Sequence, residues 1–187
     1  MGARPDSAFA PMPDHAVTEA VLQAAGVAFT ALRNGFYADS ALLLMGQALT
    51  TGRLVAPDDG PVSWTAHADL AEAAAIALTD EGRLDGLTPP LTGTEALSLA
   101  DLAALASELT GRPITRVTVR DEEYRADLIA RGVPAPRADL LVGLFVASRR
   151  GEFAAVDPTL SRLLGRPPRS IREILATRIA RQSGGSV

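Results

Sequence analysis

The feature that most constrains the fold of this chain is a repeated alternation of short apolar runs and helix-like segments that stops near Pro134. The run Val27–Leu32 is short and nearly all apolar, which is typical of a strand buried on both faces of a parallel sheet. Segments with apolar residues at helical spacing separate it from similar runs further along the chain. The pattern predicts an α/β fold with a parallel sheet, followed by a part that contains only helices.

Turn and capping residues set the expected limits of these elements. Strands are expected at Val27–Leu32, Arg53–Val55, Val62–Trp64, Leu87–Thr92 and Ile114–Val119. Helices are expected from Asp14 to Gly26, from Asp39 or Ser40 to about Gly52, over Leu70–Leu78 behind Asp69, from Ser98 to Leu109, from Asp121 to Gly132, and over Pro136–Arg150, Pro158–Leu164 and Ile171–Ala180. We expect one domain over residues 1–187, with 1–13 and 181–187 disordered, because proline interrupts the first segment and Gly and Ser dominate the last.

Composition excludes several classes of function. The net charge is −4 and the positive charges are scattered, so we expect neither a nucleic-acid partner nor a membrane-surface partner. The chain has no cysteine and only two histidines, which argues against disulfides, thiolate catalysis and a metal site. No apolar run approaches the roughly 18 residues of a membrane span, so we expect a soluble, cytoplasmic protein.

Motifs of the common catalytic sites are absent from the sequence. No G-x-G-x-x-G turn or P-loop occurs, and the chain has no lysine. The sequence therefore contains no recognisable backbone nest for a pyrophosphate. It also lacks G-x-S-x-G and H-E-x-x-H, and its carboxylates lie mostly at expected helix starts, so hydrolase chemistry has no support.

Five short segments nevertheless occur in an order that resembles a known family. They cover residues 14–19 (D-H-A-V-T-E), 33–37 (R-N-G-F-Y), 64–73 (W-T-A-H-A-D-L-A-E-A), 91–93 (L-T-G) and 101–111, which begins D-L-A and ends E-L-T-G. Over about residues 6–178 the chain resembles the NmrA-like atypical short-chain dehydrogenases/reductases, and within them the NAD(P)H quinone-oxidoreductase-like branch.

The resemblance implies a fold class and a place within it. The chain would form the later strands of a partial Rossmann-like, doubly wound parallel sheet, with a mostly helical C-terminal cap on the substrate side. It would correspond to the C-terminal two-thirds of an NAD(P)-binding domain. A segment of about a hundred residues with the phosphate-binding turn would then precede it, so the chain is expected to be truncated.

The same resemblance implies site residues. Ligands of doubly wound folds lie outside the carboxyl ends of the strands, where residues 33–37 are expected. Asn34, Gly35 and Phe36 would contact the cofactor, and Tyr37 would contact the substrate. His15 would stand in the slot of the lysine in the Tyr-x-x-x-Lys pair of typical members, with Pro11 in the tyrosine slot.

A proline cannot donate a proton, so His15 would at most bind ribose hydroxyls or transfer a proton. Each of these residues also has a purely structural interpretation: His15 as a helix-start residue, Asn34-Gly35 as a turn pair, and Tyr37 and Trp64 as core aromatics. His67 is expected to precede the helix behind Asp69 and is assigned no chemistry.

These considerations predict an NAD(P)H-dependent oxidoreductase of the quinone or small-carbonyl type, because a quinone can take up its protons from water. The alternatives are a non-enzymatic NmrA-like binding or regulatory remnant, and one half of a split oxidoreductase. The cofactor would be NAD(P)H, with NADH and NADPH not distinguished, and this chain alone would bind it weakly. An incomplete sheet is also a reason to expect a homo-oligomer or pairing with the N-terminal half.

Overall fold

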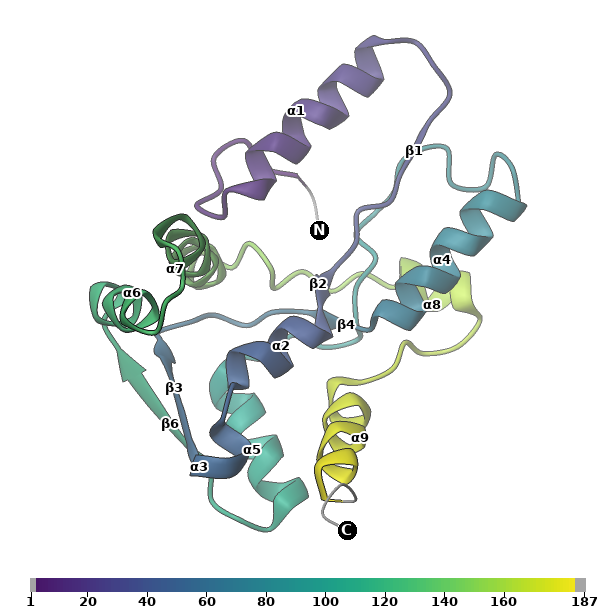
Figure 1. Ribbon diagram of the computed structural model, residues 1–187. Coiled ribbons are helices and arrows are strands. Elements are labelled where there is room, and N and C mark those ends of the chain that lie inside the picture. The colour runs from purple at the N-terminus through teal and green to yellow at the C-terminus, as the bar shows by residue number, and fades with distance from the viewer. Residues whose placement is uncertain (1–2, 184–187) are drawn as a thin grey trace.

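The computed structural model describes residues 3–183, and in it the strands form three separate parallel pairs (Figure 1). The pairs are β1 (Thr30–Ala31) with β5 (Gly86–Leu87), β2 (Phe36–Tyr37) with β4 (Trp64–Thr65), and β3 (Arg53–Pro57) with β6 (Thr115–Val119). A parallel bridge between Asn34 and Leu91 extends the first pair. The predicted α/β class and parallel pairing are confirmed.

Nine helices within residues 3–183 complete the fold. They are α1 (Pro11–Ala24), α2 (Ala38–Met45), α3 (Ala48–Thr51), α4 (His67–Thr79), α5 (Leu99–Thr110), α6 (Asp121–Ala130), α7 (Ala135–Arg149), α8 (Thr159–Leu164) and α9 (Ile171–Ser183). The expectation that only helices follow Pro134 is confirmed for residues 135–183. In this described part of the chain, no helix combines the length and the apolar character needed to cross a membrane.

Several expected helix limits are wrong. The first helix begins at Pro11 instead of Asp14, because a proline in the first turn loses no helical hydrogen bond. Residues 11–13 are therefore helical where disorder was expected. The helix expected to run to Gly52 is split into α2 and α3 by Gly46, which has a positive φ of 50°. At the other end α9 reaches Ser183, and the disorder expected for residues 1–2 and 184–187 lies outside the described residues.

The strand expected at Val27–Leu32 is also shorter than predicted. Only Thr30–Ala31 is paired as a strand, and none of residues 27–32 is buried. Val27 is 57% exposed. Among the described strands only β5 pairs with this segment, so one edge of it has no neighbouring strand. The prediction of a strand buried on both faces is therefore wrong for this chain.

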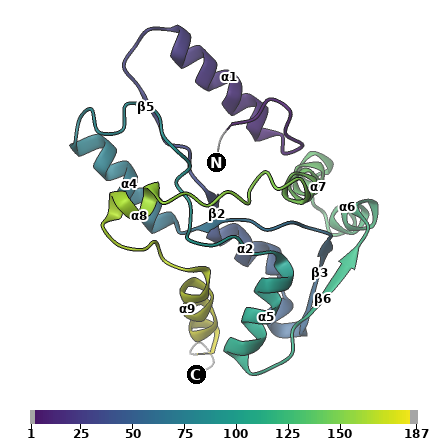
Figure 2. The same ribbon diagram turned by 180° about the vertical axis from the view of Figure 1, so that it is seen from behind.

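The core lies between the β2–β4 and β3–β6 pairs and helices α2, α5, α7 and α9, whereas α1 stands away from this body and contains no buried residue (Figures 1 and 2). Aromatic rings fill its centre. Phe36 is 5.0 Å from Phe153 and 5.8 Å from Trp64, measured between ring centroids, and Phe9 lies 5.7 Å from Phe36. A second, smaller cluster joins α4 to α8.

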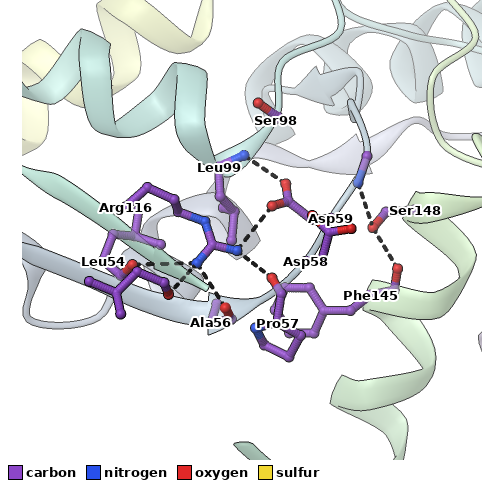
Figure 3. Close-up of polar contacts among 12 residues, drawn as sticks. Leu54, Ala56, Pro57, Asp58, Asp59, Ser98, Leu99, Arg116, Phe145 and Ser148 are labelled. Atoms are coloured by element: carbon purple, nitrogen blue, oxygen red, sulfur yellow. Dashed lines mark hydrogen bonds and ion pairs between the residues drawn. The ribbon is translucent and has the colours of Figure 1, made fainter. Parts of the chain in front are cut away.

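A largely buried ion pair joins β6, the end of β3 and α5 (Figure 3). The Arg116 guanidinium on β6 donates to the carbonyl oxygens of Ala56 at 2.8 Å and of Pro57, and its Nη2 lies 3.1 Å from Asp59 Oδ1. The other oxygen of Asp59 accepts the N–H of Leu99, the first residue of α5, at 2.7 Å. One carboxylate thus caps a helix and neutralises an arginine, fixing the β3–β6 pair relative to α5.

Candidate functional site

A pocket of about 520 Å³ lies where α1 faces the segment that leaves β1. Its lining includes every residue singled out from the sequence as a site candidate: His15, Asn34, Gly35, Phe36 and Tyr37. Its volume is in the range of ordinary small-molecule sites. The structure therefore brings α1 and the end of β1 together around one pocket.

An ion pair fixes α1 over this pocket. Arg33 donates through Nε to Glu19 Oε1 at 2.9 Å and through Nη2 to Oε2 at 2.7 Å, and both residues line the pocket. The two side chains are only 26% and 15% exposed. The hydrogen bonds from Arg33 lower the pKa of Glu19 and those to Glu19 raise the pKa of Arg33, against the opposing effect of burial. Sequence reasoning did not find this pair, because nothing local links a helix carboxylate to an arginine 14 positions later.

Gly35 is required by packing at the strand ends. Its N–H donates to the Leu91 carbonyl at 2.7 Å, and a Cβ added to Gly35 would lie 2.2 Å from Thr65 Oγ1. The backbone of Gly35 therefore passes between two neighbouring segments with no room for a side chain. Its amide is used inside the protein, and the preceding residue, Asn34, is half-buried in the pocket lining with its amide oxygen buried.

The two aromatic residues of the segment have different environments. Phe36 is buried in the aromatic core, whereas Tyr37 is 42% exposed. The Tyr37 ring stacks on the imidazole of His67, with 4.3 Å between centroids and 29° between planes. His67 Nδ1 in turn contacts Asp39 Oδ2. Sequence reasoning gave His67 no chemistry, and it overlooked Asp39 as a partner because the two residues are 28 positions apart.

His15 lies on the exposed surface of α1, one turn after Pro11, and both residues line the pocket. The N-terminal segment closes part of the same space through Phe9, whose ring packs against Phe36 and Phe153. The lining thus combines apolar and aromatic surface with a small set of polar groups, the composition typical of a small-molecule site.

Comparison with known proteins identifies relatives of this architecture, although no family model matches the chain. Quinone oxidoreductase 2 of Escherichia coli is 32% identical over 161 residues, which cover 86% of this chain and 56% of that protein. An NmrA-like family domain-containing oxidoreductase of Aspergillus flavus is 28% identical over 169 residues, or 86% and 54% of the two chains. The chain spans about half the length of the curated relatives it matches.

A solved structure is similar over nearly the whole chain. The crystal structure of the E. coli NADPH-dependent quinone oxidoreductase complexed with NADPH superimposes with a TM-score of 0.86 at 29% identity, covering 93% of this chain and 62% of that one. The Rossmann-like character expected for the parallel strand pairs is thereby confirmed. These similarities confirm the resemblance to the NmrA-like oxidoreductases, and within them to the quinone-oxidoreductase-like branch, that the ordered segments indicated.

Proposed function

We propose that this chain forms the nicotinamide and substrate side of an NAD(P)H-dependent oxidoreductase that reduces quinones. The observation that carries the proposal is the single pocket lined by His15 from α1 and by Asn34, Gly35, Phe36 and Tyr37 from the end of β1. The relatives add support, because one is named a quinone oxidoreductase and its solved structure contains NADPH.

The residues present fit the nicotinamide end of such a cofactor. Asn34 lies in the lining, and since its amide oxygen is buried, its NH₂ group is the part that would donate to a carboxamide oxygen. Phe36 and Tyr37 line the same pocket with aromatic rings that suit a flat ring. The diphosphate end has less support: Arg33 in the pocket is already paired with Glu19, and the chain has no lysine. We therefore expect weak cofactor binding by this chain alone.

The chain's own residues would act chiefly by positioning. When bound, the dihydronicotinamide supplies a hydride. Phe36 and Tyr37 would exclude water and orient a flat quinone, and orientation is a major part of the acceleration of such a transfer. His15, exposed on α1, would hold a ribose hydroxyl or transfer a proton, since Pro11 one turn earlier can do neither with its side chain.

Titration of the chain with NADPH, followed by nicotinamide fluorescence, tests the proposal. We expect a saturable change at high cofactor concentration that weakens in His15→Asn and Asn34→Ala. Gln23→Asn, an exposed residue on the same helix outside the pocket lining, is the matched control and should bind like the unmodified chain. No saturable change up to millimolar NADPH would refute the cofactor assignment, and micromolar affinity would refute the argument for weak binding.

Exposed apolar side chains also support the alternative of a partner-dependent or non-enzymatic module. Val17 and Val21 on α1, Val27 before β1 and Leu78 on α4 are between 57% and 83% exposed. Leu78 also lines an open hollow of about 660 Å³ between the 28–32 segment and α4. We propose that further β/α units, from the same or a separate polypeptide, cover these exposed side chains. The chain alone should then self-associate, which sedimentation equilibrium measures.

A further inference from the structure

Two side chains that do not line the pocket, His67 and Asp39, form a cluster with Tyr37, which does. The imidazole of His67 stacks on the Tyr37 ring at 4.3 Å, and its Nδ1 contacts the Asp39 carboxylate. Only Tyr37 of the three lines the pocket itself.

The strand register explains why these residues meet. β2 and β4 are parallel, with Tyr37 opposite Thr65. Asp39 lies two residues beyond the last residue of β2, in the first turn of α2. His67 lies two residues beyond the last residue of β4, as the first residue of α4. Because parallel strands end at the same edge, equivalent positions after the two strands lie side by side, and the carboxylate of one helix start reaches the imidazole of the other.

The exposure of the pair argues that packing is not its main contribution. The side chains of His67 and Asp39 are 54% and 62% exposed, so the contact between them contributes little to folding. Yet the imidazole of His67 has two contacts: Nδ1 contacts the Asp39 carboxylate, and one face of the ring stacks on the Tyr37 phenol. The Tyr37 ring, although 42% of that residue is exposed, is thereby covered on one face by the imidazole.

We infer that Asp39 and His67 are positioning residues for Tyr37. Asp39 orients the imidazole, and the imidazole fixes the Tyr37 ring as a flat wall for an aromatic substrate. The inference rests on the proposed function, which makes Tyr37 a substrate contact. It extends that function to two residues that touch Tyr37 and not the substrate.

Two substitutions of His67 separate the ring from the hydrogen bond. His67→Asn keeps a side-chain N–H that can reach Asp39 but removes the ring. His67→Phe keeps a ring on Tyr37 but loses the contact with Asp39. The readouts are the NMR signals of the Tyr37 ring protons and the dissociation constant of menadione, a flat quinone. Tyr124, the second of the two tyrosines, is an internal control whose ring signals should not move.

In His67→Asn we expect the Tyr37 ring signals to shift and the menadione dissociation constant to rise by about two- to tenfold, the range for loss of one aromatic pair. His67→Phe should show a smaller rise. Unchanged Tyr37 signals in His67→Asn would overturn the inference, as would shifted signals with unchanged menadione affinity; the proposed function would survive both. Failure of the unmodified chain to bind menadione would refute the proposed function and the inference with it.

Discussion

Replacing Arg116 by Met should be among the most destabilising single changes in this chain. Arg116 and Asp59 are only 13% and 10% exposed, and the guanidinium also satisfies the carbonyl groups of Ala56 and Pro57. The substitution leaves a largely buried carboxylate that still accepts the Leu99 N–H but has no counter-charge. Breaking a buried pair in this way costs about 3–5 kcal/mol. For a chain of this size, each kcal/mol lowers Tm by about 2–4 °C, so the expected loss is about 6–20 °C.

Urea unfolding and calorimetry of three variants measure this cost. Arg172→Met is the matched control, because Arg172 pairs with Glu108 on the surface, where the side chains are 54% and 64% exposed, and should cost less than about 1 kcal/mol. Asp59→Asn added to Arg116→Met should recover part of the loss, since it removes the unpaired charge and keeps an oxygen for Leu99. If Arg116→Met costs no more than Arg172→Met, the pair does not join β6 to α5 as argued.

Three further predictions concern the pocket and the exposed surface. Gly35→Ala should lower the free energy of unfolding by about 2–4 kcal/mol, because the new Cβ would meet Thr65 Oγ1 and disturb the hydrogen bond to Leu91. Gly111→Ala, which has open space but a φ of +66°, should lower it by about 1 kcal/mol. Equal losses in urea unfolding would contradict the packing argument. Because Arg33 lowers the pKa of Glu19 below 4.5, the ion pair stabilises the fold fully above that pH and less as pH falls through the lowered pKa. Glu19→Gln should therefore make the free energy of unfolding depend less on pH in the acid range. An unchanged dependence on pH would contradict the stabilising role of the pair. Leu78→Ser combined with Val21→Ser should reduce self-association in sedimentation equilibrium, since these side chains are 83% and 61% exposed, and unchanged association would exclude this surface.

The parts of the fold that the sequence predicted well are those that depend on neighbouring residues. Ser98 and Asp101 exchange hydrogen bonds at the start of α5, as do Ser170 and Glu173 at the start of α9. Such caps are complete within four residues, so local reading finds them. Strand lengths depend on which distant segment lies alongside. Val27–Leu32 has the composition of a buried strand, yet only Thr30–Ala31 is paired. Its one described partner, β5, is itself only two residues long.

The candidate site follows the same division. The segment 33–37 could be proposed because it leaves a predicted strand, and strand ends are where such folds place ligands. The Glu19–Arg33 and Asp39–His67 pairs could not, because each joins elements whose approach is set by the tertiary fold. His67 was harder still to identify, because at the start of an alanine-rich helix a histidine is equally compatible with an ordinary first-turn position.

The segment that carries the site also carries part of the core, and this has a consequence for any mutational study of it. Gly35 and Phe36 are buried, the first against Thr65 and the second among aromatic rings. Asn34 is half-buried and Tyr37 is exposed, and both line the pocket. Loss of binding after a change at Gly35 or Phe36 is therefore expected whatever the ligand, because the strand ends themselves would move. Only changes at Asn34 and Tyr37, made in a chain whose unfolding midpoint is unaltered, can show that this segment contacts a ligand.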